Sequence, residues 1–233
     1  MRFALTLLLT LLAGCASGDA PPAEPEGQVS SERTEGGRYP ARWWAPVDEA
    51  EKAWWEILPQ AAGPGEVILS KRHELGLLSN FAATPFELEG TRYASLEGFW
   101  QAMKYPEGPE DPRAQHPGLT WKHTRAEVEA MTAFDAHSAG VAAEENMKAM
   151  GIDWISYRGE RLRFKGPDQA RHYELILAAS EAKVAQNPRV REVLLATGDL
   201  VLKPDHVQEE DATPAWRYFE IYMKIRAELQ QSE

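Results

Sequence analysis

The single cysteine of this 233-residue chain, Cys15, is the feature that most constrains how the chain can fold. Because there is no second cysteine, no intramolecular disulfide can form, and any folded domain must be held together by its hydrophobic core. The hydrophobic content of 43% is enough for one sizeable core in a chain of this length. We therefore expect one folded domain with appended segments.

The first fourteen residues predict a processing signal that is not part of the fold. They carry a positive charge at Arg2, followed by a continuous apolar run that ends in small residues. This run is shorter than the roughly 20 residues that cross a bilayer as a helix. Residues 12–15, Leu-Ala-Gly-Cys, resemble a bacterial lipobox, which implies a lipoprotein signal peptide over residues 1–14 and a lipid anchor on Cys15. The alternative is an ordinary secretory signal in which Cys15 is incidental.

The lipobox resemblance also implies a location in the cell envelope. Ala16 follows the cysteine where an aspartate would resemble an inner-membrane retention signal, which favours the outer membrane. Residues 16–39 are rich in Pro, Gly, Ser and Glu and contain almost no apolar side chains. Such a segment cannot bury enough surface to offset its ordering entropy, so it predicts a flexible tether. Residues 15–64 are therefore interpreted as a lipid-anchored tether and a tryptophan-rich arm.

Two tryptophan pairs, at residues 43–44 and 54–55, distinguish this arm. A helix that begins at Pro46 or Asp48 would place the second pair and Leu58 on one side. One interpretation is a helix that docks a partner or a membrane interface. The other is an arm that packs its tryptophans onto the domain, and this is favoured because aromatic faces on soluble chains are usually buried.

From residue 65 to residue 233 the pattern predicts one helix-rich α+β domain with a small sheet near its N-terminus. Strands are expected at 67–70, at 85–88 and 91–93 as a hairpin around Glu89-Gly90, and at 200–202. Helices are expected at 95–105, 125–134, 135–150, 168–186, 188–197 and 214–230. Since most of the expected strands precede residue 94 and the chain after it is mostly helical, the small sheet should lie in the first third of the domain.

The formal net charge of −11 argues against general binding of duplex DNA or RNA, because an acidic surface repels a polyanion. The charge does not exclude a small phosphorylated ligand in a local basic pocket. The oligomeric state is not determined by the sequence.

The expected helix at 95–105 has two different faces. The apolar face contains Leu96, Trp100 and Met103, and another face presents Glu97, Gln101 and Lys104 at the same i, i+4, i+7 spacing. One face should pack on the core. By spacing alone, the other is interpreted as a solvated polar face rather than a site.

The flanking residues change this interpretation. The Leu-Ser-Asn-Phe turn at 78–81, the hairpin with its central Gly90, and the helix with Glu97, Gln101 and Lys104 together resemble the signature of the NADAR (YbiA-like) family. Further likeness to the family is found at residues 182–187, in the Leu-Leu-Ala-Thr-Gly segment at 194–198, and at 223–229. The resemblance covers most of the chain from Val67 to Leu229.

The resemblance implies an N-glycosidase that hydrolyses the bond between ribose C1′ and a base or amine, with no cofactor and no metal. The implied substrate is a small molecule of the ADP-ribosyl-guanine type or a phosphorylated ribosylamino-pyrimidine. The implied catalytic residues are Glu97 as acid or base, Lys104, and a loop acid that matches Asp205, with Asp211 as a competing match. Lys104 would either attack C1′ as a nucleophile, or only bind phosphate or position Glu97.

The same comparison implies substrate-binding roles for six residues, namely Asn80, Phe81, Gln101, Trp154, His206 and Trp216. Trp154 would be a stacking platform, although a single tryptophan after a helix is more often part of a core. His206 would carry a proton, although exposed loop histidines are common. Trp216 is retained, whereas the glycine-rich stretch that many family members have before the final helix is replaced by residues 214–220.

Two further functions remain open. The chain could be a non-catalytic lipoprotein module that binds ADP-ribose or a nucleotide. It could also be a structural lipoprotein that docks a partner through its tryptophan-rich arm. The acid on the 95–105 helix favours catalysis, because a binder has no use for a carboxylate aimed at an anionic ligand.

Overall fold

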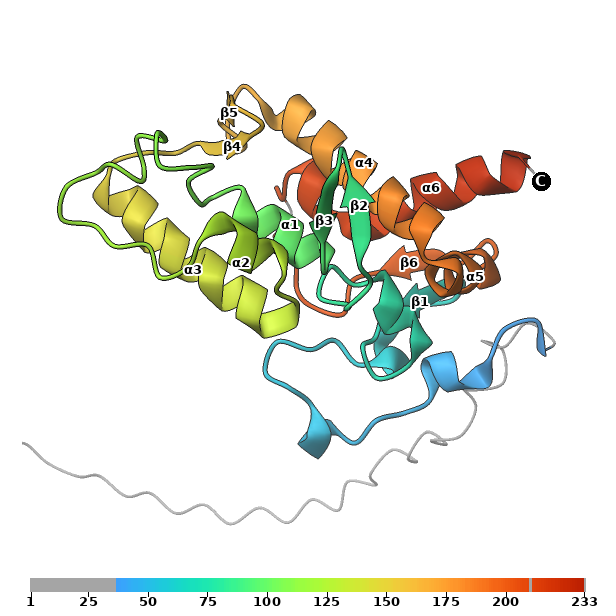
Figure 1. Cartoon of the computed structure of the whole chain (residues 1–233). Coiled ribbons are helices and arrows are strands. Elements are labelled where there is room, and N and C mark those ends of the chain that lie inside the picture. The colour runs from blue at the N-terminus through green and yellow to red at the C-terminus, as the bar shows by residue number, and fades with distance from the viewer. Residues whose placement is uncertain (1–36, 210, 233) are drawn as a thin grey trace, which may run out of the picture.

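The computed structural model describes residues 37–209 and 211–232. The expected signal peptide, Cys15 and most of the tether lie outside the described residues. Six α-helices dominate the described part of the chain (Figure 1): α1 Leu96–Ala102, α2 Arg125–Glu129, α3 Ala133–Ala149, α4 Gln169–Gln186, α5 Pro188–Ala196 and α6 Tyr218–Ser232. In Figure 1, α2 and α3 lie on one side of α1, and α4 and α6 lie on the other.

The strands form three small sheets of two strands each. β1 (Glu66–Ile68) pairs in parallel with β6 (Val201–Lys203). The other two pairs are antiparallel hairpins: β2 (Phe86–Leu88) with β3 (Thr91–Tyr93), and β4 (Ile155–Tyr157) with β5 (Glu160–Leu162). The α+β class with few strands agrees with the sequence-based expectation, but the expected concentration of the sheet in the first third is wrong. β1 finds its partner about 135 residues away in sequence, and a hairpin lies between α3 and α4.

Both hairpins turn through two residues with positive φ. Glu89 and Gly90 have φ of 50° and 83°, and Arg158 and Gly159 have φ of 52° and 83°. This left-handed pair matches the twist of the flanking strands, and glycine at the second position has no Cβ to resist it. The first hairpin was expected from Glu89-Gly90, whereas the second was not.

Helix α1 is fixed tightly against α2. Ser95 accepts a hydrogen bond from the Gly98 N–H at 2.9 Å as N-cap and donates to the Met131 carbonyl at 2.9 Å. A Cβ on Gly98 would lie 2.6 Å from that carbonyl oxygen, so only glycine permits this approach. The helix ends at Ala102, three residues before the expected end at Tyr105. The start of the helix, and therefore the register of its polar face, is set by Ser95.

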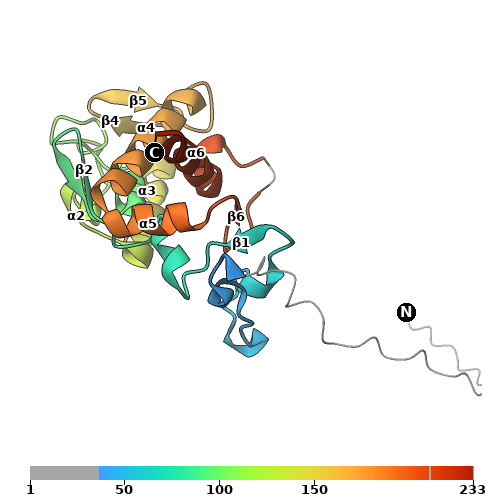
Figure 2. The same ribbon diagram turned by 90° about the vertical axis from the view of Figure 1, so that its right-hand side faces the viewer.

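The arm contributes to the main hydrophobic core. Tyr39, Trp43 and Trp44 are buried in the same cluster as β1 and α5. The Trp44 indole N–H donates to the Glu66 carbonyl of β1 at 2.8 Å, and the Trp43 indole N–H donates to Glu74 at 2.9 Å. The first tryptophan pair therefore packs onto the domain. Figures 1 and 2 show the arm beside β1, at the end of the molecule opposite the β4–β5 hairpin.

The expected helix from Pro46 or Asp48 to Leu58 is wrong. Asp48 does accept from the Ala50 N–H, but it caps only a single 3-10 turn at Glu49–Glu51, and Lys52 is already extended. The following residues are held by tertiary contacts: Glu56 pairs with Arg72, and the Ile57 N–H donates to the Asp205 carbonyl at 2.7 Å. These contacts override the local preference for helix.

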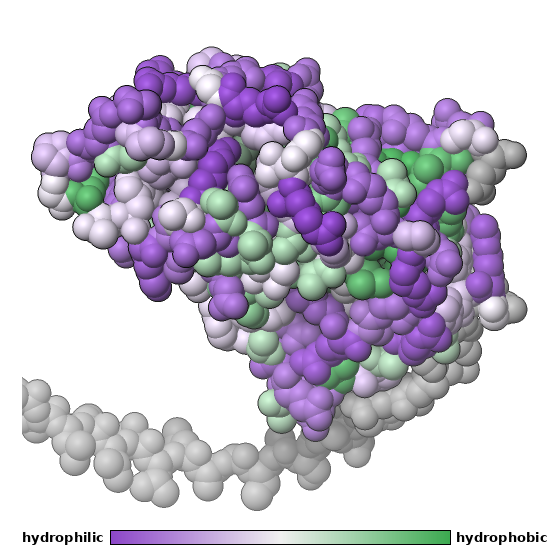
Figure 3. All heavy atoms as spheres, viewed as in Figure 1, coloured by the Kyte–Doolittle hydropathy of each residue, from purple (hydrophilic) through white to green (hydrophobic). Residues whose placement is uncertain are grey.

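Smaller shifts occur at other helix ends. The break between the second and third helices falls before Ala133, so Phe134 belongs to α3. Thr213-Pro214 starts a 3-10 turn at Pro214–Trp216, and α6 begins at Tyr218. Among the described residues, none of the helices combines the length and apolar character needed to cross a membrane. The face in Figure 3 is mostly hydrophilic, with scattered hydrophobic residues.

Candidate active site

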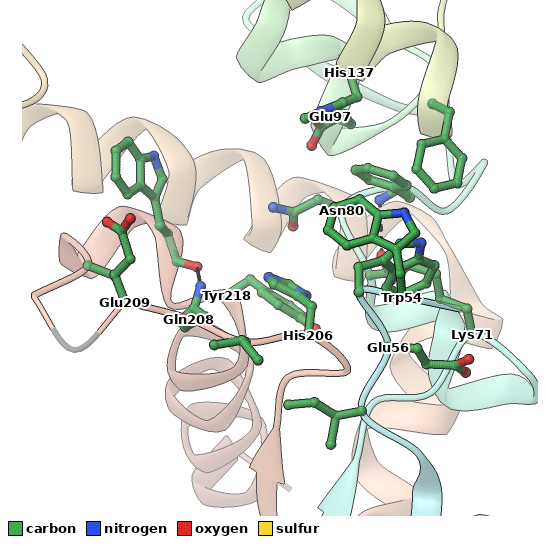
Figure 4. A pocket seen from close by; sticks show the side chains of 18 of the residues that line it. Trp54, Glu56, Lys71, Asn80, Glu97, His137, His206, Gln208, Glu209 and Tyr218 are labelled. Carbon is green, nitrogen blue, oxygen red and sulfur yellow. Dashed lines mark hydrogen bonds and ion pairs between the residues drawn. The ribbon is translucent and has the colours of Figure 1, made fainter. Parts of the chain in front are cut away.

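One cavity of about 1030 Å³ lies where α1, the start of α3, the arm and the loop after β6 meet. Figure 4 shows Glu97 and His137 on one side of it, Trp54 and Lys71 on a second, and His206 with Tyr218 on a third. The walls therefore come from segments that are far apart in the sequence. A volume of this size lies at the upper limit for small-molecule and cofactor sites.

Glu97 and Gln101 of the expected polar face line this cavity and are both buried. The Gln101 amide donates to Glu97 Oε1 at 2.7 Å, and the Glu97 backbone N–H donates to the Asn80 carbonyl at 3.0 Å. On α3, Gly140 makes room for the amide, because a Cβ there would lie 1.7 Å from Gln101 Oε1. The carboxylate is thus oriented by its own helix and by the close approach of α3.

His137 of α3 completes the surroundings of Glu97. Its Nδ1 lies 3.6 Å from Glu97 Oε1, and its side chain is about half exposed. The neighbouring Glu97 carboxylate raises the pKa of His137 above its ordinary value, against the opposing effect of partial burial. A protonated imidazole beside a carboxylate can supply a proton to a ligand in the cavity.

Lys104 lies just beyond the end of α1 and is 3% exposed. Its Nζ is 2.5 Å from Glu144 Oε1 on α3 and 5.0 Å from the centre of the Trp100 ring. Burial lowers the pKa of this amine, and the bond to Glu144 offsets only part of the effect. An amine that loses its proton more easily is a better nucleophile near neutral pH.

Asp205 forms a separate buried cluster. Its carboxylate lies 2.5 Å from Lys71 Nζ and 3.1 Å from His206 Nδ1, and it is 1% exposed. Burial raises the pKa of Asp205, but the bonds from His206 and Lys71 outweigh this effect and hold the pKa below its ordinary value. Asp205 thus pairs with Lys71 and not with Lys104. It does not itself line the cavity, whereas Lys71 and His206 do.

The structure does not bring all the residues expected from the sequence together. Asn80, Phe81, His206 and Trp216 line the cavity with Glu97, Gln101 and Lys104. Trp154 lies outside the lining, with the guanidinium groups of Arg113 and Arg161 at 4.6 and 4.4 Å from the centres of its rings. Asp211 is exposed and also lies outside it.

Sequence reasoning missed His137, Glu144 and Lys71, which contact Glu97, Lys104 and Asp205 respectively. His137 and Glu144 are seven residues apart and share a face of α3, a spacing that could have identified a polar stripe. Nothing in the spacing links this stripe to α1. Trp100, which was assigned to the packing face, also lines the cavity.

Comparisons with known proteins identify little. No family model matches the sequence, and no curated protein matches it. The structure is similar to an NMR structure of the E. coli protein YbiA, with 20% sequence identity and a TM-score of 0.43 over 81% of this chain and 95% of that chain. Among the described residues, there is no group of three or more His, Cys, Asp or Glu side chains that could hold a metal ion.

Proposed function

We propose that the chain is an N-glycosidase that hydrolyses the bond between ribose C1′ and the nitrogen of a base or amine. The observation that carries the proposal is the buried amine of Lys104 in the same cavity as the Glu97 carboxylate. The resemblance of residues 78–104 to the NADAR signature points to the same class of reaction.

The reaction needs a nucleophile for C1′ and an acid for the leaving nitrogen, and Lys104 and the Glu97–His137 pair supply them. The neutral amine of Lys104 forms a bond to C1′, and the C1′–N bond breaks as the leaving nitrogen takes a proton from the Glu97–His137 pair. The C1′–O4′ bond then breaks to give an imine between Lys104 and C1′, and O4′ takes up a proton as Lys104 gives one up. Water adds to C1′ and displaces the amine, which restores Lys104 and gives a ribose that keeps the group on its C5′. The net change is one water consumed and one C–N bond cleaved.

Glu144 is the acceptor for the proton that Lys104 must lose before it can attack C1′. Lys104 cannot attack while it is an ammonium, and Glu144 Oε1, at 2.5 Å from Nζ, is placed to take its proton. Glu144 lies at the edge of the cavity and its side chain is 58% exposed, so it can pass the proton to solvent. His137 and Glu144 of α3 thus serve Glu97 and Lys104 respectively.

The test is release of guanosine from ADP-ribosylated guanosine, and of the free aminopyrimidine from a ribosylamino-pyrimidine phosphate, measured by chromatography. We expect Glu97→Gln and Lys104→Met to lower release by at least a hundredfold with unchanged folding. Glu145→Gln is the matched control, because Glu145 is an exposed neighbour of Glu144 on α3. Release by the wild type that persists in both site variants would overturn the proposal.

The second function to weigh is a non-catalytic module that binds ADP-ribose or a nucleotide. The volume of the cavity and its several lysines are suited to binding a phosphorylated nucleotide, but they give no evidence against catalysis. Titration with ADP-ribose separates the two. Binding without any release of base from the conjugates would leave the binding module as the function.

We also propose that Cys15 anchors the protein to the cell envelope through a lipid, as the Leu-Ala-Gly-Cys sequence indicates. Metabolic labelling with a fatty acid should mark the wild type and not Cys15→Ser. Equal labelling of both would contradict the anchor.

A further inference from the structure

Exposed apolar side chains are concentrated at the mouth of the cavity. Five large hydrophobic residues are exposed in the described part of the chain: Trp54, Phe134, Val141, Val201 and Val207. All except Val201 line the cavity, and Trp54 is 95% exposed. Leaving a tryptophan in water forgoes a large burial energy, so a cluster of this kind marks a binding surface.

Four aromatic side chains on one side of this mouth are called the aromatic wall: Trp55, Phe81 and Phe134, whose rings lie near one another, and the exposed Trp54, which precedes Trp55 and lines the same cavity. The Phe81 and Phe134 rings meet edge to face with centres 5.1 Å apart, and the Trp55 and Phe134 rings lie 6.3 Å apart. Lys71 Nζ lies 4.8 Å from the centre of the Trp55 ring and 5.5 Å from that of Phe81. Figure 4 shows Trp54 and Lys71 on the same side of the cavity as Asn80.

The wall is joined directly to the proposed reaction centre. Phe81 follows Asn80, whose carbonyl accepts the hydrogen bond from the Glu97 N–H. Phe134 lies in the first turn of α3, the helix that carries His137, and the Phe81 and His137 rings lie 6.1 Å apart. A group bonded to a ribose at Glu97 therefore has the wall as its neighbour.

We propose that the aromatic wall is the subsite for the leaving group, and that it takes a planar nitrogen heterocycle of the purine or pyrimidine class. This inference rests on the proposed function, because it assigns the leaving group of that reaction. Every nucleobase has a π-face that stacks on an aromatic side chain. An acyl chain fits less well, because it would have to cover the charged groups of Lys71 and of Glu56, which is 7% exposed and also lines the cavity.

The inference gives the arm a direct role in substrate choice. Trp54 and Trp55 belong to the segment that precedes residue 65, outside the region that resembles the NADAR signature. The tertiary contacts of Glu56 with Arg72 and of Ile57 with Asp205 hold this segment against the cavity. Trp43 and Trp44 anchor the arm in the core, and Trp54 and Trp55 are left to contact the ligand.

The experiment compares two substrates that share the ribosyl group: one with a purine leaving group, and ribosylurea, whose leaving group is not aromatic. We expect Trp54→Ala to raise KM for the purine substrate about tenfold, the value of one base–aromatic stack, with kcat little changed. KM for ribosylurea should stay the same, and Trp54→Phe should restore most of the loss. Val201→Ala, an exposed apolar site outside the cavity, is the control. Equal effects on the two substrates would overturn the inference.

A second measurement separates failure of the inference from failure of the proposed function. Guanosine 5′-monophosphate and ribose 5-phosphate are titrated by calorimetry into wild type and Trp54→Ala, without any need for turnover. Tighter binding of the nucleotide that is lost in the variant supports the subsite even if no bond is cleaved. Equal binding of the two probes in the wild type, or a Trp54→Ala effect seen only on phospholipid vesicles, would overturn it.

Discussion

Replacing Lys183 by methionine would measure the stability cost of burying a charged amine beside Ser79, which lines the cavity. Lys183 of α4 is fully buried, and its amine donates to the Ser79 carbonyl at 2.8 Å, one residue before Asn80. Burial lowers the pKa of this amine from 10.5 to about 7. The corresponding cost of keeping the charge in the folded state is ~5 kcal/mol. Removing the amine also leaves the Ser79 carbonyl without this donor, at a cost of about 1–3 kcal/mol.

The variant should therefore be more stable than the wild type at pH 6, by ~3 kcal/mol in the free energy of unfolding. The unfolded chain keeps the Lys183 proton up to its ordinary pKa, and the folded chain loses it near 7. Between these values the unfolded state binds more protons, so wild-type stability rises with pH relative to the variant. Urea denaturation at pH 6, 7.5 and 9 should show the difference shrinking as the pH rises.

Lys148→Met is the control, because Lys148 is an exposed lysine on α3 and its loss should not change the pH dependence. A difference between wild type and Lys183→Met that is the same at all three pH values would refute the reasoning. It would mean that the amine is solvated in the folded state.

Three further predictions concern the site and the arm. In Gly140→Ala the added Cβ, 1.7 Å from Gln101 Oε1, should displace the Gln101 amide from Glu97 and slow base release at least tenfold. The free energy of unfolding should change by only ~1 kcal/mol, and wild-type rates in this variant would contradict the role of the amide. Base release by the wild type should fall as the pH rises through the raised pKa of His137, because the imidazole then loses the proton that it supplies. His137→Gln should lack this limb of the pH profile, and an unchanged profile would exclude His137 as the acid. Trp43→Ala should lower the free energy of unfolding by about 3–5 kcal/mol in urea denaturation, because this ring is 1% exposed and lies in the main hydrophobic core. A loss of about 1 kcal/mol or less would show that the arm is not part of that core.

The helices could be predicted where local chemistry fixes them. Ser95 caps α1, and Asn187-Pro188 and Gly198 bound α5, because capping and the left-handed residue act within a few positions of the chain. The β2–β3 hairpin was predictable for the same reason, since Glu89-Gly90 supplies the turn. Each of these features is decided by neighbours in sequence.

The rest depends on contacts that spacing does not encode. The pairing of β1 with β6 joins segments about 135 residues apart, and the arm takes 3-10 turns because Glu56 and Ile57 are held by Arg72 and Asp205. Tertiary contacts of this kind override local preference. The register of α1 could be read from the sequence, so Glu97 and Lys104 were predicted to share a face.

The partners of these residues could not be predicted. His137 and Glu144 reach Glu97 and Lys104 only because Gly140 lets α3 approach α1. Lys71 pairs with Asp205 from a loop more than a hundred residues earlier. The sequence motif therefore predicts half of each pair, and the folded chain supplies the other half.

The most direct measurement of the central claim is reductive trapping of the wild type with sodium borohydride during turnover of a ribosylated base, followed by peptide mass spectrometry. The account predicts a ribosyl adduct on Lys104, which forms in His137→Gln at a lower rate and is absent from Lys104→Met. Base release without any adduct, or an adduct on Lys71 instead, would contradict the role assigned to the buried amine.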